Sequence, residues 1–259
     1  MDIVRRLDAL APIQPTDLKH ARATWAEFRG QEPPLLTAPD ANTKLNKSAI
    51  PNYGLSLAPA NLSEHNPCRY ATPQCIEVCV AFAGKGELAQ VQRGRIWKTQ
   101  FLTAFPAEFV TLLAWETHKA SVKHNSNMTM RLNVFSDIPW ERIIPWYFEW
   151  ASDVRFYDYT KWPAHTRGVQ PSNYDLTYSV SERWSEYQMQ YMLDKGHRIA
   201  VVVPRGQESD ITEWRGYPCV NGDTGDLRWL DPSPAIVLLK AKGRARSLPV
   251  GGFVRDMST

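Results

Sequence analysis

Residues 176–203 read LTYSVSERWSEYQMQYMLDKGHRIAVVV, and this stretch decides the fold class. Its two ends, Leu176–Val180 and Arg198–Val203, are short runs rich in Val, Ile and Tyr, as is typical of strands. The residues between them predict a helix over Arg183–Leu193. A strand, a helix and a second strand in succession predict a βαβ unit, in which the two strands lie parallel in one sheet.

The same alternation extends in both directions from this unit. Further strands are predicted at Tyr53–Leu57, Thr129–Phe135, Val154–Tyr159 and Ile236–Lys240. Further helices are predicted from Pro73 to about Ala83, from about Ala89, from about Ala107 to Lys119, and over Trp140–Trp150. We therefore expect an α/β fold, a partial (β/α) barrel of about six βα units. An open doubly wound sheet is the alternative, because the pattern does not separate the two.

The first 45 residues differ from the rest of the chain. Thr16 can cap a helix over about Asp17–Phe28, and the segment after it is rich in proline. We expect residues 1–45 to form a helical N-terminal extension with an extended arm. Residues 46–259 would then form a single α/β domain.

Composition excludes several classes of protein. Of the 259 residues, 43% are apolar, which is too many for a disordered chain. No stretch approaches the roughly 20 apolar residues of a membrane span, and the first residues lack a signal peptide, so we expect a cytoplasmic protein. The net charge of +3 is mild. The basic alternation at Lys240, Lys242, Arg244 and Arg246 permits nucleic-acid contact but favours a solvated edge strand.

Clustered cysteines are the most informative feature. Cys68, Cys75 and Cys79 lie close together in the sequence, and Cys219 is distant. Thr72 is a favourable N-cap and Pro73 a favourable first helical residue, which puts Cys75 in the first turn of the predicted helix. Cys79 would share its face of that helix, and the loop carrying Cys68 could fold back, so three thiolates could converge.

Such a triplet favours an iron–sulfur cluster, most simply [4Fe–4S], because thiolates are the usual ligands of these clusters. Zinc is the alternative, with His65 or Cys219 completing the site. Reduced, buried cysteines are a third reading. Cys219 lies in a segment, residues 217–226, that has the composition of a turn; it could be the fourth ligand or a lone core residue. Without it, one open iron would make an enzyme plausible.

Polar residues follow several predicted strands, where the sites of α/β proteins gather. Arg131 and Asn133 alternate with apolar residues and would share one strand face. From this placement, the predicted catalytic residues are Asp158, Lys161, Asp137 and Arg131, and the predicted cofactor-binding residues are Asn133, Ser136, Ser179 and Glu182. Each also has an ordinary structural reading, such as helix capping by Ser136 and Asp137 or a solvated charge at Lys161.

Five motifs, together with the cysteine triplet, carry a resemblance to a protein family. The motifs are GLSLAP (54–59), RLNVFSD (131–137), FYDYTK (156–161), NGDTGDLRWLDP (221–232) and IVLLKAKGRAR (236–246). Over about Asn46 to Arg246 the sequence resembles the phage gene-product-88-like proteins. The resemblance implies a phage protein in the cytoplasm of an infected host, but it implies no reaction. The partner would be a small-molecule ligand or a host factor.

A second resemblance is architectural. A cysteine triplet after the first strand of a partial (β/α) barrel is similar to the radical S-adenosylmethionine enzymes, which implies a [4Fe–4S] cluster and S-adenosylmethionine as cofactors. The spacing departs from that family, with six and three residues between cysteines instead of three and two, and Phe135-Ser136-Asp137 stands where that family has a glycine-rich segment. An iron–sulfur-dependent lyase, hydrolase or radical enzyme is thus one expectation. The other is a zinc-stabilised module that binds host nucleic acid or protein.

Overall fold

The computed structural model describes residues 2–39 and 50–258. The chain divides into two compact units. The first unit comprises Met1–Arg69, Leu88–Phe156 and Val169–Tyr174, and the second comprises Tyr70–Glu87, Tyr157–Gly168 and Asp175–Thr259. The boundary expected between residues 45 and 46 lies outside the described residues.

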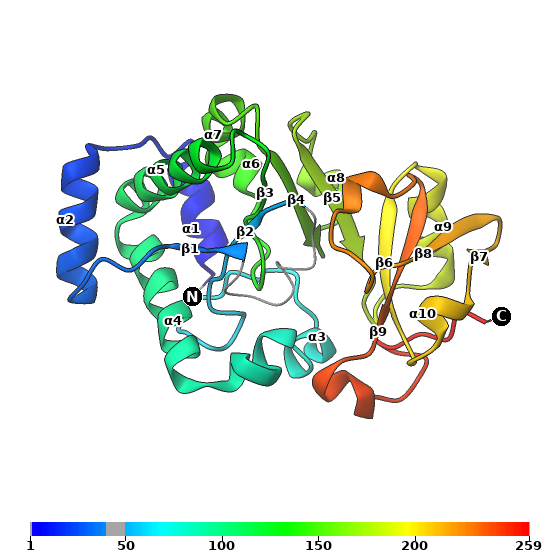
Figure 1. The fold of residues 1–259 in the computed structure, drawn as a ribbon. Coiled ribbons are helices and arrows are strands. Elements are labelled where there is room, and N and C mark those ends of the chain that lie inside the picture. The colour runs from blue at the N-terminus through cyan, green and yellow to red at the C-terminus, as the bar shows by residue number, and fades with distance from the viewer. Residues whose placement is uncertain (1, 40–49, 259) are drawn as a thin grey trace. The chain divides into compact units, whose positions relative to one another are not determined.

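The first unit contains strands β1 (Leu36–Thr37), β2 (Asn52–Leu55), β3 (Thr129–Arg131) and the start of β4 (Arg155–Thr160), side by side in that order (Figure 1). β2, β3 and β4 are parallel, and β1 is antiparallel to β2. Every residue of β2 is buried. This is the pattern of a parallel strand that is covered on both faces.

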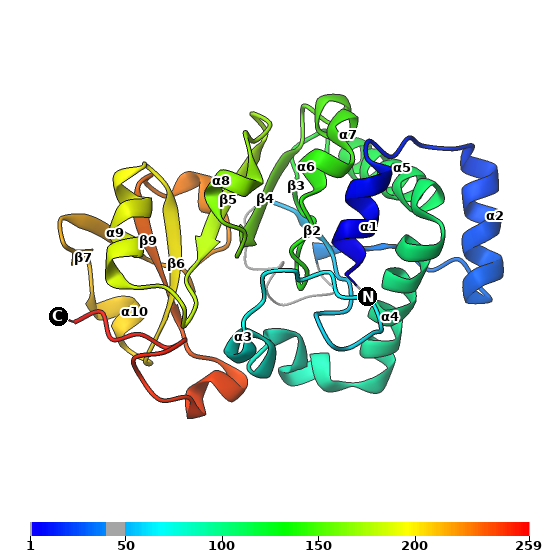
Figure 2. The same cartoon turned by 180° about the vertical axis from the view of Figure 1, so that it is seen from behind.

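Helices make up most of the regular secondary structure that is described in the first unit. They are α1 (Ile3–Leu10), α2 (Leu18–Arg29), α4 (Ala89–Ala104), α5 (Pro106–Lys123), α6 (Trp140–Ile143) and α7 (Pro145–Trp150). α2 packs against α5, and α1 lies beside α6, as both views show (Figures 1 and 2). The core of this unit is strongly aromatic, with Trp25, Phe101, Phe109, Trp140, Tyr147, Phe148 and Phe156 all buried.

Two local expectations for the first unit are wrong. The helix expected over Trp140–Trp150 is two helices, because Pro145 has no N–H to continue the first of them. Thr16 is not the cap of α2. Asp17 caps it instead, its Oδ1 accepting the His20 N–H at 2.8 Å, while the Thr16 N–H donates to Thr111 Oγ1.

The second unit holds most of β4, then β5 (Tyr174–Ser179), β6 (Arg198–Val203), β9 (Ala235–Lys240), β8 (Tyr217–Asn221) and β7 (Glu213–Trp214). The order among the last five is β5-β6-β9-β8-β7, and only the β7–β8 pair is antiparallel. The helices are α3 (Pro73–Glu77), α8 (Ala164–Arg167), α9 (Glu186–Asp194) and α10 (Gln207–Asp210). Short 3₁₀ helices span Val80–Phe82, Gly84–Glu87, Arg228–Leu230 and Gly243–Ser247.

α9 packs on β6, and α10 lies against β8 and β9 (Figure 1). Met189 and Leu193 of α9 meet Val201 of β6 and Leu238 of β9 in a buried cluster. These contacts confirm the βαβ reading of residues 176–203, since β5 and β6 are parallel neighbours and α9 connects them.

The α/β class and the mainly parallel pairing are confirmed, and in neither unit do the described pairings close a barrel. Residues 217–221 were expected as a turn but form β8, because they pair with β9 in parallel register. Within the described residues, no helix is long and apolar enough to cross a membrane.

Candidate functional site

Cys75 lies where the sequence predicts it. Thr72 caps α3, its Oγ1 accepting the Cys75 N–H at 3.4 Å, and Pro73 is the first helical residue. The helix is shorter than expected, however. It ends at Glu77, and Cys79 lies beyond it at the start of the 3₁₀ helix Val80–Phe82.

The expectation that Cys75 and Cys79 share one helix face is therefore wrong. Val78 leaves the helical region at φ −101° and ψ 18°, and Cys79 has an extended ψ of 123°. The β-branched residues Val78 and Val80 flank Cys79, and such residues support a helix weakly. Cys79 is consequently held by a loop between two short helices.

Cys68 belongs to the first unit and is held by its own loop. Its N–H donates to Asn66 Oδ1 at 2.8 Å, and its Sγ donates to the Phe135 carbonyl oxygen at 3.4 Å. Cys68, Cys75 and Cys79 are all half-buried. Among residues 2–39 and 50–258, no three His, Cys, Asp or Glu side chains are grouped as a metal ion would require.

Cys219 has a different setting. It lies in β8, opposite Ile236 of β9, and packs against the buried cluster of the second unit. Burial raises the pKa of its thiol to about 11, and the nearby Glu213 carboxylate contributes to that rise. A thiol that stays protonated is a poor metal ligand, so this environment favours the core reading of Cys219.

One predicted cofactor-binding residue of the second unit, Glu182, lies at the start of α3. Glu182 accepts a hydrogen bond from the Thr72 hydroxyl at 2.6 Å and another from the Gln74 N–H at 3.1 Å. Burial alone would raise the pKa of Glu182. The hydrogen bonds from Thr72, its own backbone and Gln74, together with the charge of Lys161, outweigh burial and lower that pKa.

The other predicted residues of this unit lie on strands or just after them. Lys161 follows β4, and its Nζ is 5.4 Å from the centre of the Phe253 ring. Asp158 is buried within β4, and Ser179 ends β5 opposite Ala200 of β6. Asp158 and Ser179 are thus residues of the sheet itself, whereas Glu182 is hydrogen-bonded to the start of α3.

In the first unit, the predicted residues form a tight turn after β3. The strand ends at Arg131, so Asn133 does not share a strand face with it. Asn133 Oδ1 accepts hydrogen bonds from the Ser136 hydroxyl and the Ile138 N–H, both at 2.9 Å. The Asp137 N–H donates to the Pro67 carbonyl oxygen at 3.0 Å. Asn133 and Ser136 thus build the turn that holds the Cys68 loop.

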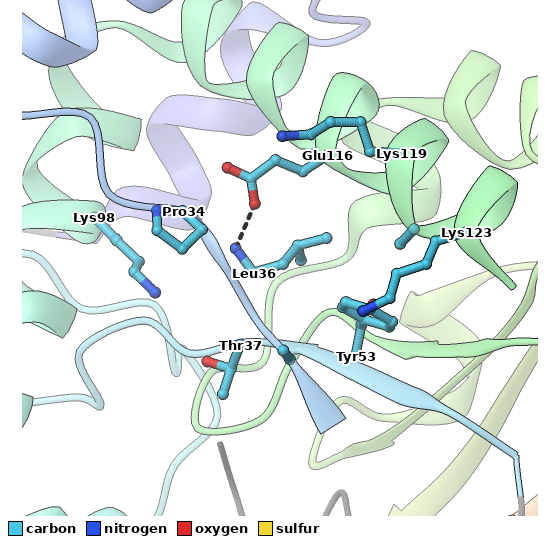
Figure 3. Close-up of a pocket in the computed structure, with 10 residues that line it drawn as sticks. Pro34, Leu36, Thr37, Tyr53, Lys98, Glu116, Lys119 and Lys123 are labelled. Atoms are coloured by element: carbon cyan, nitrogen blue, oxygen red, sulfur yellow. Dashed lines mark hydrogen bonds between the residues drawn. The ribbon is translucent and has the colours of Figure 1, made fainter. Parts of the chain in front are cut away.

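A lysine-lined cavity in the first unit was missed by sequence reasoning. It has a volume of about 550 Å³ and lies between β1, β2, α4 and α5 (Figure 3). The lining residues are Pro34, Leu36, Thr37, Ala38, Tyr53, Lys98, Glu116, Lys119, Ala120 and Lys123. The sequence feature that points to this cavity is the helical spacing of Glu116, Lys119 and Lys123. The same spacing is equally typical of a solvated helix face.

Backbone groups of Leu35 and Leu36, at the start of β1, hold two polar side chains of this cavity in place. The Glu116 carboxylate accepts the Leu35 and Leu36 N–H groups, each at 2.8 Å, and Lys98 Nζ donates to the Leu35 carbonyl oxygen at 2.7 Å. Burial raises the pKa of Glu116 despite these two hydrogen bonds. Burial also lowers the pKa of Lys98 to about 8, with a smaller opposing effect from Glu116.

Comparison with known proteins gives one match. A family model described as Gene product 88 matches residues 26–251, which is most of the chain. No curated protein and no solved structure matches it. The match confirms the resemblance carried by the motifs between Asn46 and Arg246, whereas similarity to radical S-adenosylmethionine enzymes stays a prediction.

Proposed function

The chain belongs to the gene product 88 family, and from its own residues we propose that it binds an iron–sulfur cluster through Cys68, Cys75 and Cys79. The proposed cluster is [4Fe–4S], because thiolates are its usual ligands. The description of the family names no reaction. The proposed location is the cytoplasm of the infected host.

The observation that carries this proposal is the contrast between the two kinds of cysteine. Cys219 is packed against a hydrophobic core, and its pKa is raised to about 11. Cys68, Cys75 and Cys79 lie instead in loops or in the first turn of α3. All four cysteines are half-buried, so the contrast lies in the backbone setting and the packing, not in exposure. Thiols in loops can change position to meet a ligand at lower cost than thiols within a strand, because loops carry fewer packing contacts.

The setting of Cys219 in a strand also bears on the chemistry. If three cysteines hold the cluster, the fourth iron stays open and can act as a Lewis acid or bind S-adenosylmethionine. Glu182 accepts hydrogen bonds at the start of α3, which carries Cys75, and the charge of Lys161 acts on Glu182. These two side chains would orient a polar substrate there. A partial (β/α) barrel is the finer fold that we propose to go with this arrangement.

The test is anaerobic purification of the full chain, followed by an absorption spectrum and by iron, sulfide and zinc analysis. We expect a brown protein that absorbs broadly near roughly 400 nm and contains about four iron and four sulfide. Separate Cys68→Ser, Cys75→Ser and Cys79→Ser variants should lose most of the iron. The Cys219→Ala variant is the matched control and should retain the cluster.

Each other outcome contradicts a stated part of the proposal. A colourless protein with about one zinc would replace the cluster by a zinc-stabilised module, and salt-sensitive binding of DNA or RNA would then be tested. Loss of iron in the Cys219→Ala variant would show four cysteine ligands and a closed cluster. Absence of both metals after anaerobic handling and reconstitution would remove the metal proposal. An absorption spectrum unchanged by S-adenosylmethionine would argue against that cofactor.

A further inference from the structure

The lysine-lined cavity of the first unit contains none of the residues in the proposed cluster site. Two of its walls are the helices α4 and α5, which contribute Lys98 and Glu116. The rest of the lining comes from the segment 34–38, which includes β1, and from Tyr53 of β2. Its volume of about 550 Å³ falls within the range of small-molecule sites, about 300–1,000 Å³. The cavity is therefore large enough for a molecule of one aromatic ring or a short chain.

Positive charge outweighs negative charge on the walls. Among the described residues that line the cavity, three are lysines and one, Glu116, carries a carboxyl group. Both oxygens of Glu116 already accept backbone N–H groups, and its pKa is raised by burial. One N–H of the Lys98 ammonium group donates to the Leu35 carbonyl oxygen, which leaves two of its three hydrogens for other acceptors.

The three lysines are not equivalent. In Figure 3 the Lys98 amine points towards β1, and the Lys123 side chain extends alongside Tyr53. Lys119 turns away from both, and its Nζ lies 3.4 Å from the centre of the Trp115 ring. Two amines thus border the cavity from different sides, and the third is occupied by an aromatic face.

The rest of the lining is largely apolar. Pro34, Leu36 and Ala120 contribute only hydrocarbon groups, and Tyr53 adds a buried ring whose hydroxyl is hydrogen-bonded to His124 Nε2 at 3.0 Å. An inorganic ion would leave these surfaces without contacts. A ligand with an apolar body and an anionic end would use both the apolar walls and the amines.

We propose that this cavity binds a small organic anion, a carboxylate or phosphate ester with an apolar body, and that Lys98 and Lys123 pair with its charged group. Leu36 and Tyr53 then contact the apolar body. The proposal is independent of the iron–sulfur cluster, because no cysteine lines the cavity.

Binding should take up a proton when Lys98 is partly neutral. The Glu116 carboxylate, which comes from α5, raises the pKa of Lys98. The positive charge of Arg95, which lies on the same helix as Lys98, lowers that pKa. An anion beside Lys98 would raise its pKa above about 8. The affinity should consequently be full below that pH and fall as the pH rises through it.

The experiment is isothermal titration of the full chain with phenyl phosphate at pH 7.5, with benzyl alcohol as the neutral probe of similar shape. We expect saturable binding of phenyl phosphate that is at least about tenfold tighter than that of benzyl alcohol. Lys98→Gln and Lys123→Gln should each weaken it by about tenfold. Lys119→Gln removes the same charge from the same helix face and should change affinity less than about threefold.

Thermal unfolding checks that each variant is folded. If Lys98→Gln is unfolded, the proposal is tested by Lys123→Gln and by titration of the wild type at pH 9.5. Weaker binding at pH 9.5 supports the assignment. The proposal is overturned if phenyl phosphate does not bind, if benzyl alcohol binds equally well, or if Lys119→Gln weakens binding as much as Lys123→Gln does.

Discussion

Tyr147 is completely buried, and its hydroxyl group lies between two other elements of the first unit. It is 2.6 Å from Thr117 Oγ1 of α5 and 3.3 Å from Met130 Sδ of β3. Burial raises the pKa of this phenol well above its ordinary value, so it stays neutral and hydrogen-bonded. The pair connects α5, α7 and β3 through a polar contact inside an aromatic core.

Replacing Thr117 by Val should therefore destabilise the protein. The substitution keeps the volume but removes the hydroxyl, which leaves the buried Tyr147 hydroxyl with a weaker partner, and we expect a loss of about 1–3 kcal/mol in the free energy of unfolding. Urea unfolding followed by tryptophan fluorescence measures it. Thr117→Ser keeps the hydroxyl and should lose clearly less; equal losses in both variants would show that the methyl group, not the hydrogen bond, matters.

At this scale, sequence reasoning succeeded where a residue acts on its neighbours in the chain. Thr72 and Pro73 are a local signal, and they begin α3 as expected. Lys98 and Glu116 meet through the backbone of Leu35, 63 and 81 residues away in the chain, and no local pattern encodes that meeting. Asn133 was assigned to a strand because alternation cannot show that its side chain turns back to the Ile138 N–H.

The packing of β9 against the residue that follows β8 explains why that residue is a glycine. Gly222 follows β8, and a Cβ atom there would lie 2.5 Å from Val237 Cγ1 and 2.7 Å from Leu239 Cδ2. Its N–H donates to the Leu238 carbonyl oxygen at 2.8 Å, which fixes the close approach of the two backbones. The composition of this segment predicts a turn at the Asn-Gly pair. The requirement for glycine at position 222, however, comes from the close packing of β9.

Gly222→Ala should cost about 1–3 kcal/mol of unfolding free energy, because the added methyl group overpacks against β9. Gly225, in the same loop, has open space where a Cβ atom would lie, with no atom within 4 Å, and its φ is not positive. Gly225→Ala is therefore the control and should change stability by less than about 0.5 kcal/mol. Chemical denaturation of both variants decides, and similar midpoints would contradict the packing argument.

Asp223 connects the same loop to the end of β9. Its Oδ2 accepts the Lys240 N–H at 2.9 Å, and its Oδ1 forms an ion pair with Lys242. Burial tends to raise the pKa of Asp223, but the hydrogen bonds and charges of Lys242 and Lys240 outweigh it and lower the pKa.

The carboxylate therefore stabilises the fold above its unfolded pKa of about 3.9, and this contribution is lost as the pH falls through the lower native value. We expect Asp223→Asn to lower stability at pH 6 and to lose less stability than wild type does on acidification to pH 2. Urea midpoints across that range measure the difference. Parallel curves for the two proteins would show that Asp223 contributes nothing to acid sensitivity.

Among the elements, those with long local patterns were predictable. The starts of α4 and α5 and the full extent of β6 agree with the sequence to within a residue. The two-residue strands β1 and β7 were not predicted, because they are defined by pairing with β2 and β8 rather than by their own residues. Breaks within helical patterns, at Val78 and at Pro145, were overlooked in favour of longer helices.

Across the whole molecule, the N-terminal residues are part of a core. Ile3, Val4 and Leu7 of α1 are fully buried. The Ile13 N–H donates to the Ile143 carbonyl oxygen at 2.9 Å, and Trp146 Nε1 donates to the Ile13 carbonyl oxygen at 2.8 Å. This segment thus joins the first unit by apolar and polar contacts together.

Deleting residues 1–14 should cost more than about 4 kcal/mol, since each buried aliphatic side chain contributes about 1.5–3 kcal/mol. The truncated chain should be insoluble or unfold at a much lower urea concentration. Asp8→Asn, which removes only the partly exposed ion pair with Arg142, should cost less than about 1 kcal/mol. A truncated chain with wild-type stability would show that α1 is dispensable.

The path of the chain through the two units has a consequence for how the gene can vary. The chain passes from one unit to the other after Arg69, Glu87, Phe156, Gly168 and Tyr174. A recombination joint anywhere between residues 70 and 174 would divide both units at once, so neither can be exchanged as a cassette. During synthesis, likewise, the first unit cannot be complete until residue 174 has left the ribosome, so both units mature late in translation.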